Sequence, residues 1–380
     1  MKTTQIFIFL SIVFTIYGLI NFYILRRALT VVSPQHKTLF LIIAVFIVVS
    51  YIAGRFLDRV WISPISSGLI WIGSFWLAFM IYIFMALVIV DLLRLINHFI
   101  HFFPFFVTKD IERAKKFTAI AILALSVIIV AGGFINSLVL IEKKYNITIK
   151  KPAGDLKSLR IAVASDLHLG TIYSYGFMYE LSERLNNMNP DIILLAGDII
   201  DEDLGPVIKY DVGAHLLRLK AKYGVYAVTG NHEYIGGVSE AVKYLEKHNI
   251  TVLRDSSVKI NNSFYVAGRD DRTNRSRATI EQIINDADKS LPIIMMDHQP
   301  FHLEEAKKNN IDLQVSGHTH NGQLWPFNYL VEKIYDLAWG YKVDSNTHYY
   351  VSCGAGGWGP PIRTGSRPEI ITINLKFVGK

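Results

Sequence analysis

The feature that most constrains this chain is a series of four long apolar stretches near its N-terminus. They cover residues 5–25, 38–54, 68–90 and 117–141. Each approaches the roughly 20 apolar residues that a helix needs to cross the hydrocarbon core of a bilayer. A cleaved signal peptide would explain only the first stretch, which also lacks a small-residue cleavage pattern. The sequence therefore predicts an integral membrane protein with an N-terminal α-helical transmembrane bundle of about four spans.

The composition changes after the fourth stretch. Of the 380 residues, 51% are hydrophobic, more than in an ordinary soluble enzyme. The excess lies in the first part, because from Lys143 onward polar and apolar residues mix as they do in a globular domain. We therefore expect a transmembrane helical domain over residues 1–145 and a globular domain over residues 146–380.

The net charge of +7 does not by itself indicate nucleic acid as a partner. Lys and Arg are scattered, and the sequence has no basic tract of five or more residues. Membrane flanks explain part of the charge, so the lipid bilayer is the expected partner and nucleic acid is disfavoured. The single cysteine, Cys353, cannot form an internal disulfide and is expected to be buried.

The positions of Lys and Arg around the spans predict an orientation, since these residues are retained in the cytoplasm. The loops after the first and third spans are rich in them: Arg26, Arg27, Lys37, Arg94, Lys109, Arg113, Lys115 and Lys116. The opposite side has fewer, namely Lys2, Arg55 and Arg59, although Lys143 and Lys144 weaken the contrast. With an even number of spans, both termini and the globular domain are expected outside the cytoplasm.

Residues 91–106 fit an interfacial amphipathic helix.

The second domain alternates short apolar runs with amphipathic stretches, which predicts a layered α/β domain with sheet at its centre. Buried strands are expected at residues 159–165, 191–196, 225–229, 292–296 and 312–316. Helices are expected at residues 175–188, 212–222, 239–248 and 279–288. Later strand-like runs, at residues 257–267, 347–352 and 369–377, add further sheet.

Residues of metal-ligand type follow these strands directly. They are Asp166, His168, Asp198, Asn231, His298, His318 and His320. In open α/β sheets, sites form at the carboxyl ends of strands, so five such ends could converge on one rim. Each residue alone fits a structural role, such as a capping carboxylate or a hydrogen-bonded histidine. Together they predict a metal site.

The residue types suggest how such a site would be built. The pairs Asp166/His168 and His318/His320 have the spacing i, i+2, which in an extended segment points both side chains to one face. The two carboxylate oxygens of Asp198 suit a bridge between two ions. A mixture of imidazole and oxygen ligands suits manganese, zinc or iron, and manganese is the first choice.

The ordered motifs DLH, GDIID, GNHE, DHQP and GHTH, from about residue 160 to 320, resemble the calcineurin-like metallophosphoesterase superfamily. The resemblance implies a central β-sandwich flanked by helices and two divalent metal ions. It implies one ion on Asp166, His168, Asp198 and His320. It places the second ion on Asp198, Asn231, His298 and His318, with Asp198 bridging.

A narrower resemblance is carried by two later segments, GHTHNGQLWPF and RTGSRPEI. They are similar to a bacterial branch of membrane-associated or exported phosphoesterases, some of which are linked to lipid A precursors. Asn321 stands where that branch has glycine.

Further residues are expected to act on the substrate. His232, which has no metal in this scheme, is expected to protonate the leaving oxygen or stabilise phosphoryl charge. Asp201 is expected to orient His232, with a loop or helix-cap carboxylate as the alternative. Arg363 and Arg367 lie in a loop rich in Gly and Pro that is expected on the surface. They could bind a substrate phosphate, with solvated loop charges as the alternative.

The expected function is hydrolysis of a phosphodiester or pyrophosphate bond by a membrane-anchored enzyme with two metal ions. The substrate would be a phosphorylated small molecule or a lipid-linked or nucleotide-linked compound such as a lipid A precursor. A lipid A precursor would place the domain in the cytoplasm, against the predicted orientation. The alternatives are a phosphomonoesterase that scavenges phosphate outside the cell, which that orientation favours, and a non-catalytic membrane scaffold.

Overall fold

The computed structural model describes residues 3–379, so Lys2, one of the charges used to predict orientation, lies outside the described part. The chain divides into two compact units, Met1–Gly133 and Phe134–Lys380. The domain boundary expected at residue 145 falls inside the first strand of the second unit.

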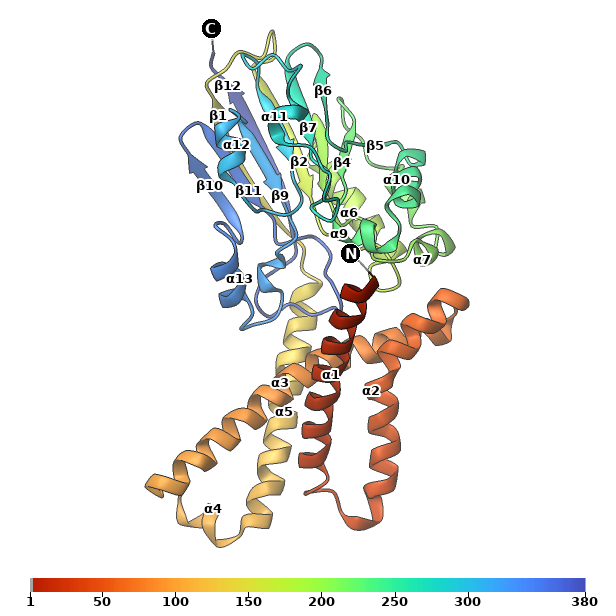
Figure 1. The fold of residues 1–380 in the computed structure, drawn as a ribbon, viewed down its shortest axis with the longest axis vertical. Helices are drawn as coiled ribbons and strands as arrows, with labels where there is room; N and C mark the ends of the chain where they lie inside the picture. Colours follow the sequence, from red (N-terminus) through yellow and green to blue (C-terminus); the bar gives the residue numbers. More distant parts are fainter. Residues whose placement is uncertain (1–2, 380) are drawn as a thin grey trace. The chain divides into compact units, whose positions relative to one another are not determined.

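The first unit is built from long apolar helices (Figure 1). Within residues 3–379, four helices are long and apolar enough to cross a membrane. They are α1 (Thr3–Ala28), α2 (Lys37–Val60), α3 (Pro64–Ile100) and α5 (Ile111–Ser137), and the last four residues of α5 belong to the second unit. The four expected spans are therefore confirmed as helices of suitable length and composition.

Close packing of α2 against α3 depends on small residues. A Cβ atom on Gly73 would collide with the backbone of Tyr51, and one on Gly54 would lie 2.8 Å from the backbone nitrogen of Ile70. Small residues at such contacts let helix backbones approach closely, which is how apolar helices associate in lipid. Helices α2 and α3 therefore associate through close van der Waals packing of their backbones, and not through an apolar core like that of a soluble domain.

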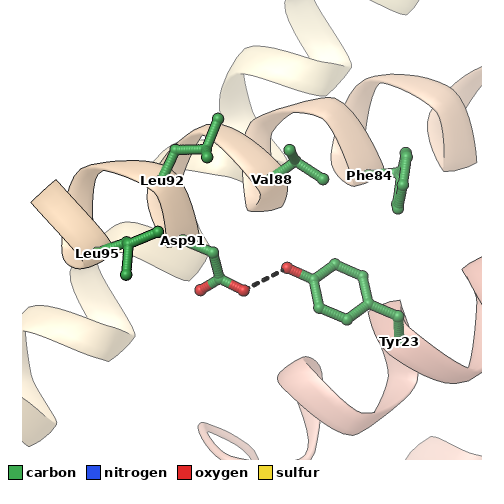
Figure 2. Close-up of a pocket in the computed structure, with 6 residues that line it drawn as sticks. All are labelled: Tyr23, Phe84, Val88, Asp91, Leu92 and Leu95. Atoms are coloured by element: carbon green, nitrogen blue, oxygen red, sulfur yellow. Dashed lines mark hydrogen bonds between the residues drawn. The ribbon is translucent and has the colours of Figure 1, made fainter.

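The polar stretch after the third apolar run is not a separate interfacial helix, because residues 91–100 continue α3 and only the short α4 (Phe105–Lys109) follows. Asp91 on this extension has partners from α1. Figure 2 shows Tyr23 pointing at Asp91, with Oη and Oδ2 2.6 Å apart, in a pocket completed by apolar side chains of α3. Arg27 pairs with the same carboxylate.

The second unit contains, among the described residues, two sheets of six strands each (Figure 1). The first has the order β1 (Ile141–Ile149), β12 (Glu369–Phe377), β2 (Ser158–Ala164), β3 (Ile192–Ala196), β4 (Val225–Val228) and β5 (Ile250–Val252). The second has the order β10 (Gly340–Asp344), β11 (Thr347–Val351), β9 (Leu313–Ser316), β8 (Ile293–Met296), β7 (Phe264–Gly268) and β6 (Ser256–Ile260).

The two sheets pack face to face, and helices cover their outer faces. In β2, Ile161 and Val163 belong to the core between the sheets, whereas Ala162 and Ala164 belong to the core under α6 (Tyr175–Asn187) and α10 (Val238–Lys247). The short helices α11 (Ile280–Ile283) and α12 (Glu304–Lys308) cover the second sheet. Strands buried on both faces read as continuous apolar runs. The expected β-sandwich flanked by helices is therefore confirmed.

Element boundaries differ from expectation where local turns intervene. The five buried strands lie within one residue of their predicted ranges. The predicted strand over residues 257–267 is a hairpin instead, because Asn261 and Asn262 adopt left-handed backbone angles between β6 and β7. The helix expected over residues 212–222 shortens to α8 (Gly213–Leu216). The predictions did not include β1, β5 and β10, nor the helices α7 (Leu204–Lys209), α9 (Asn231–Gly236), α12 and α13 (Asn328–Ile334).

Candidate metal centre

The expected ligands occupy the carboxyl ends of five strands drawn from both sheets. Asp166 and His168 follow β2, Asp198 follows β3, Asn231 follows β4, His298 follows β8, and His318 and His320 follow β9. Except for Asn231 and His318, which are partly buried, these residues are buried. The rim of the sandwich therefore gathers seven residues that are widely separated in the sequence.

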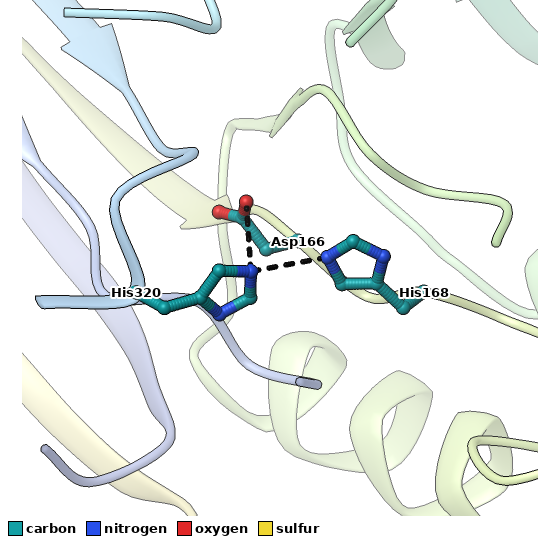
Figure 3. A group of neighbouring side chains, drawn as sticks. All are labelled: Asp166, His168 and His320. Atoms are coloured by element: carbon teal, nitrogen blue, oxygen red, sulfur yellow. Dashed lines mark hydrogen bonds and ion pairs between the residues drawn. The ribbon is translucent and has the colours of Figure 1, made fainter. Parts of the chain in front are cut away.

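One group consists of Asp166, His168 and His320, whose ligand atoms lie within 4.8 Å of one another. Figure 3 shows the His320 ring pointing at both other side chains. Its Nε2 lies 3.1 Å from Nε2 of His168 and 3.6 Å from Oδ1 of Asp166. This separation suits side chains that share one ion.

A second group consists of Asp198, His298 and His318, again within 4.8 Å. The Nδ1 atom of His298 lies 2.7 Å from the carbonyl oxygen of Ala196 and donates to it, so Nε2 of the neutral ring carries a lone pair. That Nε2 lies 3.0 Å from Oδ2 of Asp198 without hydrogen-bond geometry. Although burial alone would lower the pKa of His298, the charge of Asp198 and the contact with it raise that pKa well above its usual range, so this pair of atoms favours a proton or a metal ion between them.

Several side-chain atoms of the candidate ligands are buried in this site without a hydrogen-bond partner. Among the described residues, Oδ2 of Asp166, Oδ1 of Asn231 and Nε2 of His298 are buried and accept no hydrogen bond. Each such buried polar atom costs about 1–3 kcal/mol if nothing compensates it. Three orphaned acceptors beside the two groups are the arrangement expected of metal ligands, so the residues present fit a divalent metal centre.

Backbone contacts aim the two carboxylates. The amide of His232 donates to Oδ1 of Asp198 at 2.9 Å, and the amide of His318 donates to Oδ1 of Asp166 at 2.9 Å. Glycine makes these approaches possible, because a Cβ atom on Gly317 would collide with Oδ2 of Asp166. In each carboxylate one oxygen is fixed by the backbone and Oδ2 is left for a ligand.

The backbone conformation of the pairs Asp166/His168 and His318/His320 differs from the extended one that was expected. Asp166 and His168 have φ values of 52° and 46°, and His318 and His320 have values of 72° and 47°. These left-handed angles are uncommon for residues other than glycine and concentrate at functional sites. The assumed extended geometry is therefore wrong. The chain turns tightly after each strand, and the turn directs both side chains of a pair inward.

Burial sets the protonation of two imidazoles. It lowers the pKa of His318 to about 4, because the charged ring is penalised away from water and His298 adds positive charge. Burial also lowers the pKa of His320, and His168 and Arg363 act in the same direction. Since a metal ligand must be a neutral imidazole, both rings are in the required state at neutral pH.

His232 is paired with Asp201 as expected. Its Nδ1 lies 3.2 Å from Oδ1 of Asp201, and a carboxylate can only accept, so the ring donates. Although burial alone would lower the pKa of His232, this hydrogen bond and the charges of Asp198 and Asp201 raise it to about 9. Asp203 caps helix α7, because its side chain accepts from the amide of Gly205. The role of a helix cap, considered above as the alternative for Asp201, therefore belongs to Asp203.

The two arginines expected to bind substrate differ from each other. Arg363 is fully buried, and its guanidinium donates to the carbonyl oxygens of Cys353 and Gly356 and contacts Nδ1 of His320 at 3.2 Å. The expected surface position is wrong for Arg363, because the loop folds inward behind His320. Arg367 is exposed, and its Nε donates to Asn136 at 2.8 Å. Cys353 is buried, as expected.

One residue of the GNHE motif was given no role from the sequence. Glu233 is buried, and its two carboxylate oxygens accept from the amides of Ile200 and Gly230 at 2.8 and 2.7 Å. It therefore ties the loop after Asp198 to the turn before Asn231. The sequence could have indicated this role, since a Glu at the third position of a helix commonly accepts a hydrogen bond from the backbone at the helix start.

The departure at Asn321 has a backbone explanation. Asn321 adopts φ 47° and ψ 42°, a left-handed conformation that glycine takes most easily. Among other residues, asparagine is one of those that tolerate this region best. The substitution therefore preserves the turn that carries His320.

Comparisons with known proteins agree with this geometry. Residues 159–322 match the family model described as calcineurin-like phosphoesterase. An uncharacterized metallophosphoesterase of Aquifex aeolicus is 32% identical over 264 residues, which cover 67% of this chain and 99% of that protein. An uncharacterized metallophosphoesterase of Helicobacter pylori is 33% identical over 225 residues, covering 58% of this chain and 60% of that protein.

A relative with a membrane description is also similar. A Danio rerio protein described as a transmembrane protein with metallophosphoesterase domain is 31% identical over 246 residues, covering 60% of this chain and 56% of that protein. The alignments thus span less than two thirds of the Helicobacter and Danio relatives. The Aquifex alignment spans nearly all of its relative, and with the matching family model it shows that this chain belongs to the calcineurin-like phosphoesterase family.

Proposed function

We propose that this chain is a membrane-anchored phosphohydrolase that uses two divalent metal ions to cleave a phosphodiester or pyrophosphate bond. The observation that carries the proposal is the convergence of two ligand groups with orphaned acceptor atoms at one rim of the sandwich. The first ion would be held by Asp166, His168, Asp198 and His320. The second would be held by Asp198, Asn231, His298 and His318, with Asp198 shared.

The roles of the remaining residues follow from their contacts. Bound divalent ions supply polarisation of the phosphoryl group and activation of water. His232, held by Asp201, keeps its Nε2 available to donate a proton to the leaving oxygen. Arg363, behind His320, positions that ligand rather than gripping substrate. The mixture of imidazole and oxygen donors supports manganese first, with zinc or iron as alternatives.

The proposed substrate is a phosphorylated compound associated with the membrane, either lipid-linked or nucleotide-linked, for which a lipid A precursor is one example. Four apolar helices in the same chain support this proposal. So does Trp358, which is 54% exposed and whose ring centroid lies 6.2 Å from that of His232. An exposed aromatic side chain beside the proposed acid can pack against a lipid or a nucleobase.

The test is hydrolysis of bis-p-nitrophenyl phosphate beside p-nitrophenyl phosphate by the full chain in detergent micelles. The protein would be stripped of metal and resupplied with manganese, zinc or magnesium. Metal-dependent turnover that favours the diester supports the proposal. Preference for the monoester would instead indicate a scavenging phosphatase, and inactivity with every metal would indicate a binding scaffold.

Replacement of Asp198 by Ala tests the shared ligand in the same assay. We expect turnover to be abolished, because the carboxylate that borders both ligand groups is removed. Glu246→Ala is the matched control, since Glu246 is exposed on α10. Retention of more than a few per cent of wild-type activity by Asp198→Ala would contradict the shared role.

A further inference from the structure

Arg272 stands apart from the other arginines around the second sheet. Arg254, Arg269 and Arg277 are all paired with buried carboxylates, at N–O distances between 2.8 and 3.4 Å. The guanidinium of Arg272 instead lies on the face of Phe301, with its carbon 4.1 Å from the ring centroid. Its Nη1 is buried and has no hydrogen-bond partner within residues 3–379. Arg272 is therefore a cation with an unused donor.

Two chains of contacts connect Arg272 to the metal centre. The first chain runs through Phe301, the ring on which Arg272 stacks. The ring centroid of Phe301 lies 4.5 Å from that of Tyr335, and the centroid of Tyr335 lies 6.2 Å from that of His318. Through its neighbour in sequence, Asp271 accepts from Nε2 of Gln299 at 2.8 Å, and Gln299 follows His298 directly. Contacts thus link Arg272 to His318 through two aromatic rings and to His298 through Asp271 and Gln299.

The chemistry of the group indicates what it would bind. A guanidinium presents several donors in a rigid plane and binds phosphate oxygens in bidentate fashion. Stacking on an aromatic face fixes that plane without consuming its donors. A buried donor without an acceptor is costly, so an anionic partner would be stabilised strongly. The ligand that suits this position is a second phosphate of the substrate.

We propose that Arg272, on its platform of Phe301, forms a subsite for the second phosphate of a diphosphate substrate. This inference rests on the proposed function and narrows it, because it selects a pyrophosphate bond over a simple phosphodiester. One phosphate would lie at the ions and be attacked, and the other would be held by Arg272. A monoester has no group for this subsite and gains nothing from it.

The test measures binding, so it does not depend on turnover. The full chain in detergent micelles, loaded with manganese, would be titrated calorimetrically with methylenediphosphonate and, separately, with methylphosphonate. For Arg272→Gln we expect an affinity for the diphosphonate that is lower by on the order of tenfold or more, since charge-assisted hydrogen bonds are lost. The affinity for methylphosphonate should change less than about twofold, because that ligand does not reach the subsite.

Two further variants separate charge from geometry. Arg272→Lys keeps the charge but loses the planar fork, so it should recover only part of the affinity. Arg275→Gln is the control, because Arg275 is exposed on the same loop and should affect neither ligand. Metal content of each variant, measured by mass spectrometry, should match that of the wild type.

The outcomes distinguish the subsite from the proposed function. Equal loss of both ligands in Arg272→Gln, or no loss of either, overturns the subsite even if bis-p-nitrophenyl phosphate is hydrolysed. Selective loss of the diphosphonate supports the subsite even if no ester is hydrolysed with any metal, a result that would overturn the proposed activity alone.

Discussion

Three residues of the candidate metal centre are held in place by backbone groups. One oxygen of Asp166 and one of Asp198 are fixed by backbone amides, and Nδ1 of His298 is fixed by a carbonyl. The gathering of the candidate ligands at one rim could be predicted, because each follows an apolar run that is easy to recognise. The burial of Arg363 could not, since it depends on how a loop rich in Gly and Pro folds back onto His320.

Removal of the His232 side chain should separate catalysis from metal binding. In His232→Ala we expect metal content close to that of the wild type, because two ligand groups remain complete without it, although His232 also lies within ligand reach of His168 and Asp198. The value of kcat should fall by about 10² or more, since a positioned proton donor is lost. Metal analysis and steady-state kinetics check both parts. Loss of bound metal would instead make His232 a ligand.

The partner of His232 should control the pH profile. The carboxylate of Asp201 helps to raise the pKa of His232 to about 9, so Asp201→Asn should lower that pKa. The imidazolium, which is the proton-donating form, then disappears at a lower pH. We therefore expect the alkaline limb of the kcat/KM profile to move to lower pH. An unmoved limb would contradict the role of Asp201.

At the scale of elements, strands buried on both faces were predictable, whereas the edge strands β1, β5 and β10 were not. β3 is a continuous apolar run and β2 ends in one over residues 161–164, whereas β1 contains Glu142, Lys143 and Lys144 because much of it is exposed at a sheet edge. The turns after the strands were also unpredictable in detail. Their left-handed backbone angles occur at Gly197 but also at Asp and His residues, which give no signal of such a turn in the sequence.

The turn at Gly317 should tolerate no side chain. In Gly317→Ala the added methyl group would collide with Oδ2 of Asp166, so metal affinity should fall although no ligand is removed. We expect at least a tenfold weaker affinity, a ~1.4 kcal/mol effect, with an unchanged circular dichroism spectrum. Gly176→Ala is the control, because a Cβ atom at Gly176 meets nothing within 4 Å. Wild-type affinity in Gly317→Ala would show that this turn can relax.

Strand β1 should be required for a stable second unit. A chain beginning at residue 150 lacks Ile147 and Ile149, which are 3% and 2% exposed. Their burial stabilises the fold by about 3–6 kcal/mol, and the edge of β12 would be left unpaired. Compared with a chain beginning at residue 138, we expect a lower Tm and aggregation in size-exclusion chromatography. Equal stability of the two chains would show that β1 is dispensable.

At the scale of the molecule, the chain combines apolar helices with a metal-centre domain, and the proposed orientation puts that domain outside the cytoplasm. Cys353 is the sole cysteine and is buried, so the native chain offers a low background for thiol labelling. In Glu246→Cys, an exposed thiol is introduced on α10. We expect a membrane-impermeant maleimide to label it in intact spheroplasts. Labelling only after lysis would place the domain in the cytoplasm.

The position of β12 also has a consequence for biosynthesis. Among the described strands of its unit β12 is made last, yet it lies between β1 and β2, which are made first. The ribosome therefore delivers every ligand of the metal centre before the sheet that supports β2 can be completed. A nascent chain that ends before residue 369 leaves β1 and β2 with unpaired edges facing each other, so the second unit can close only after β12 has been made.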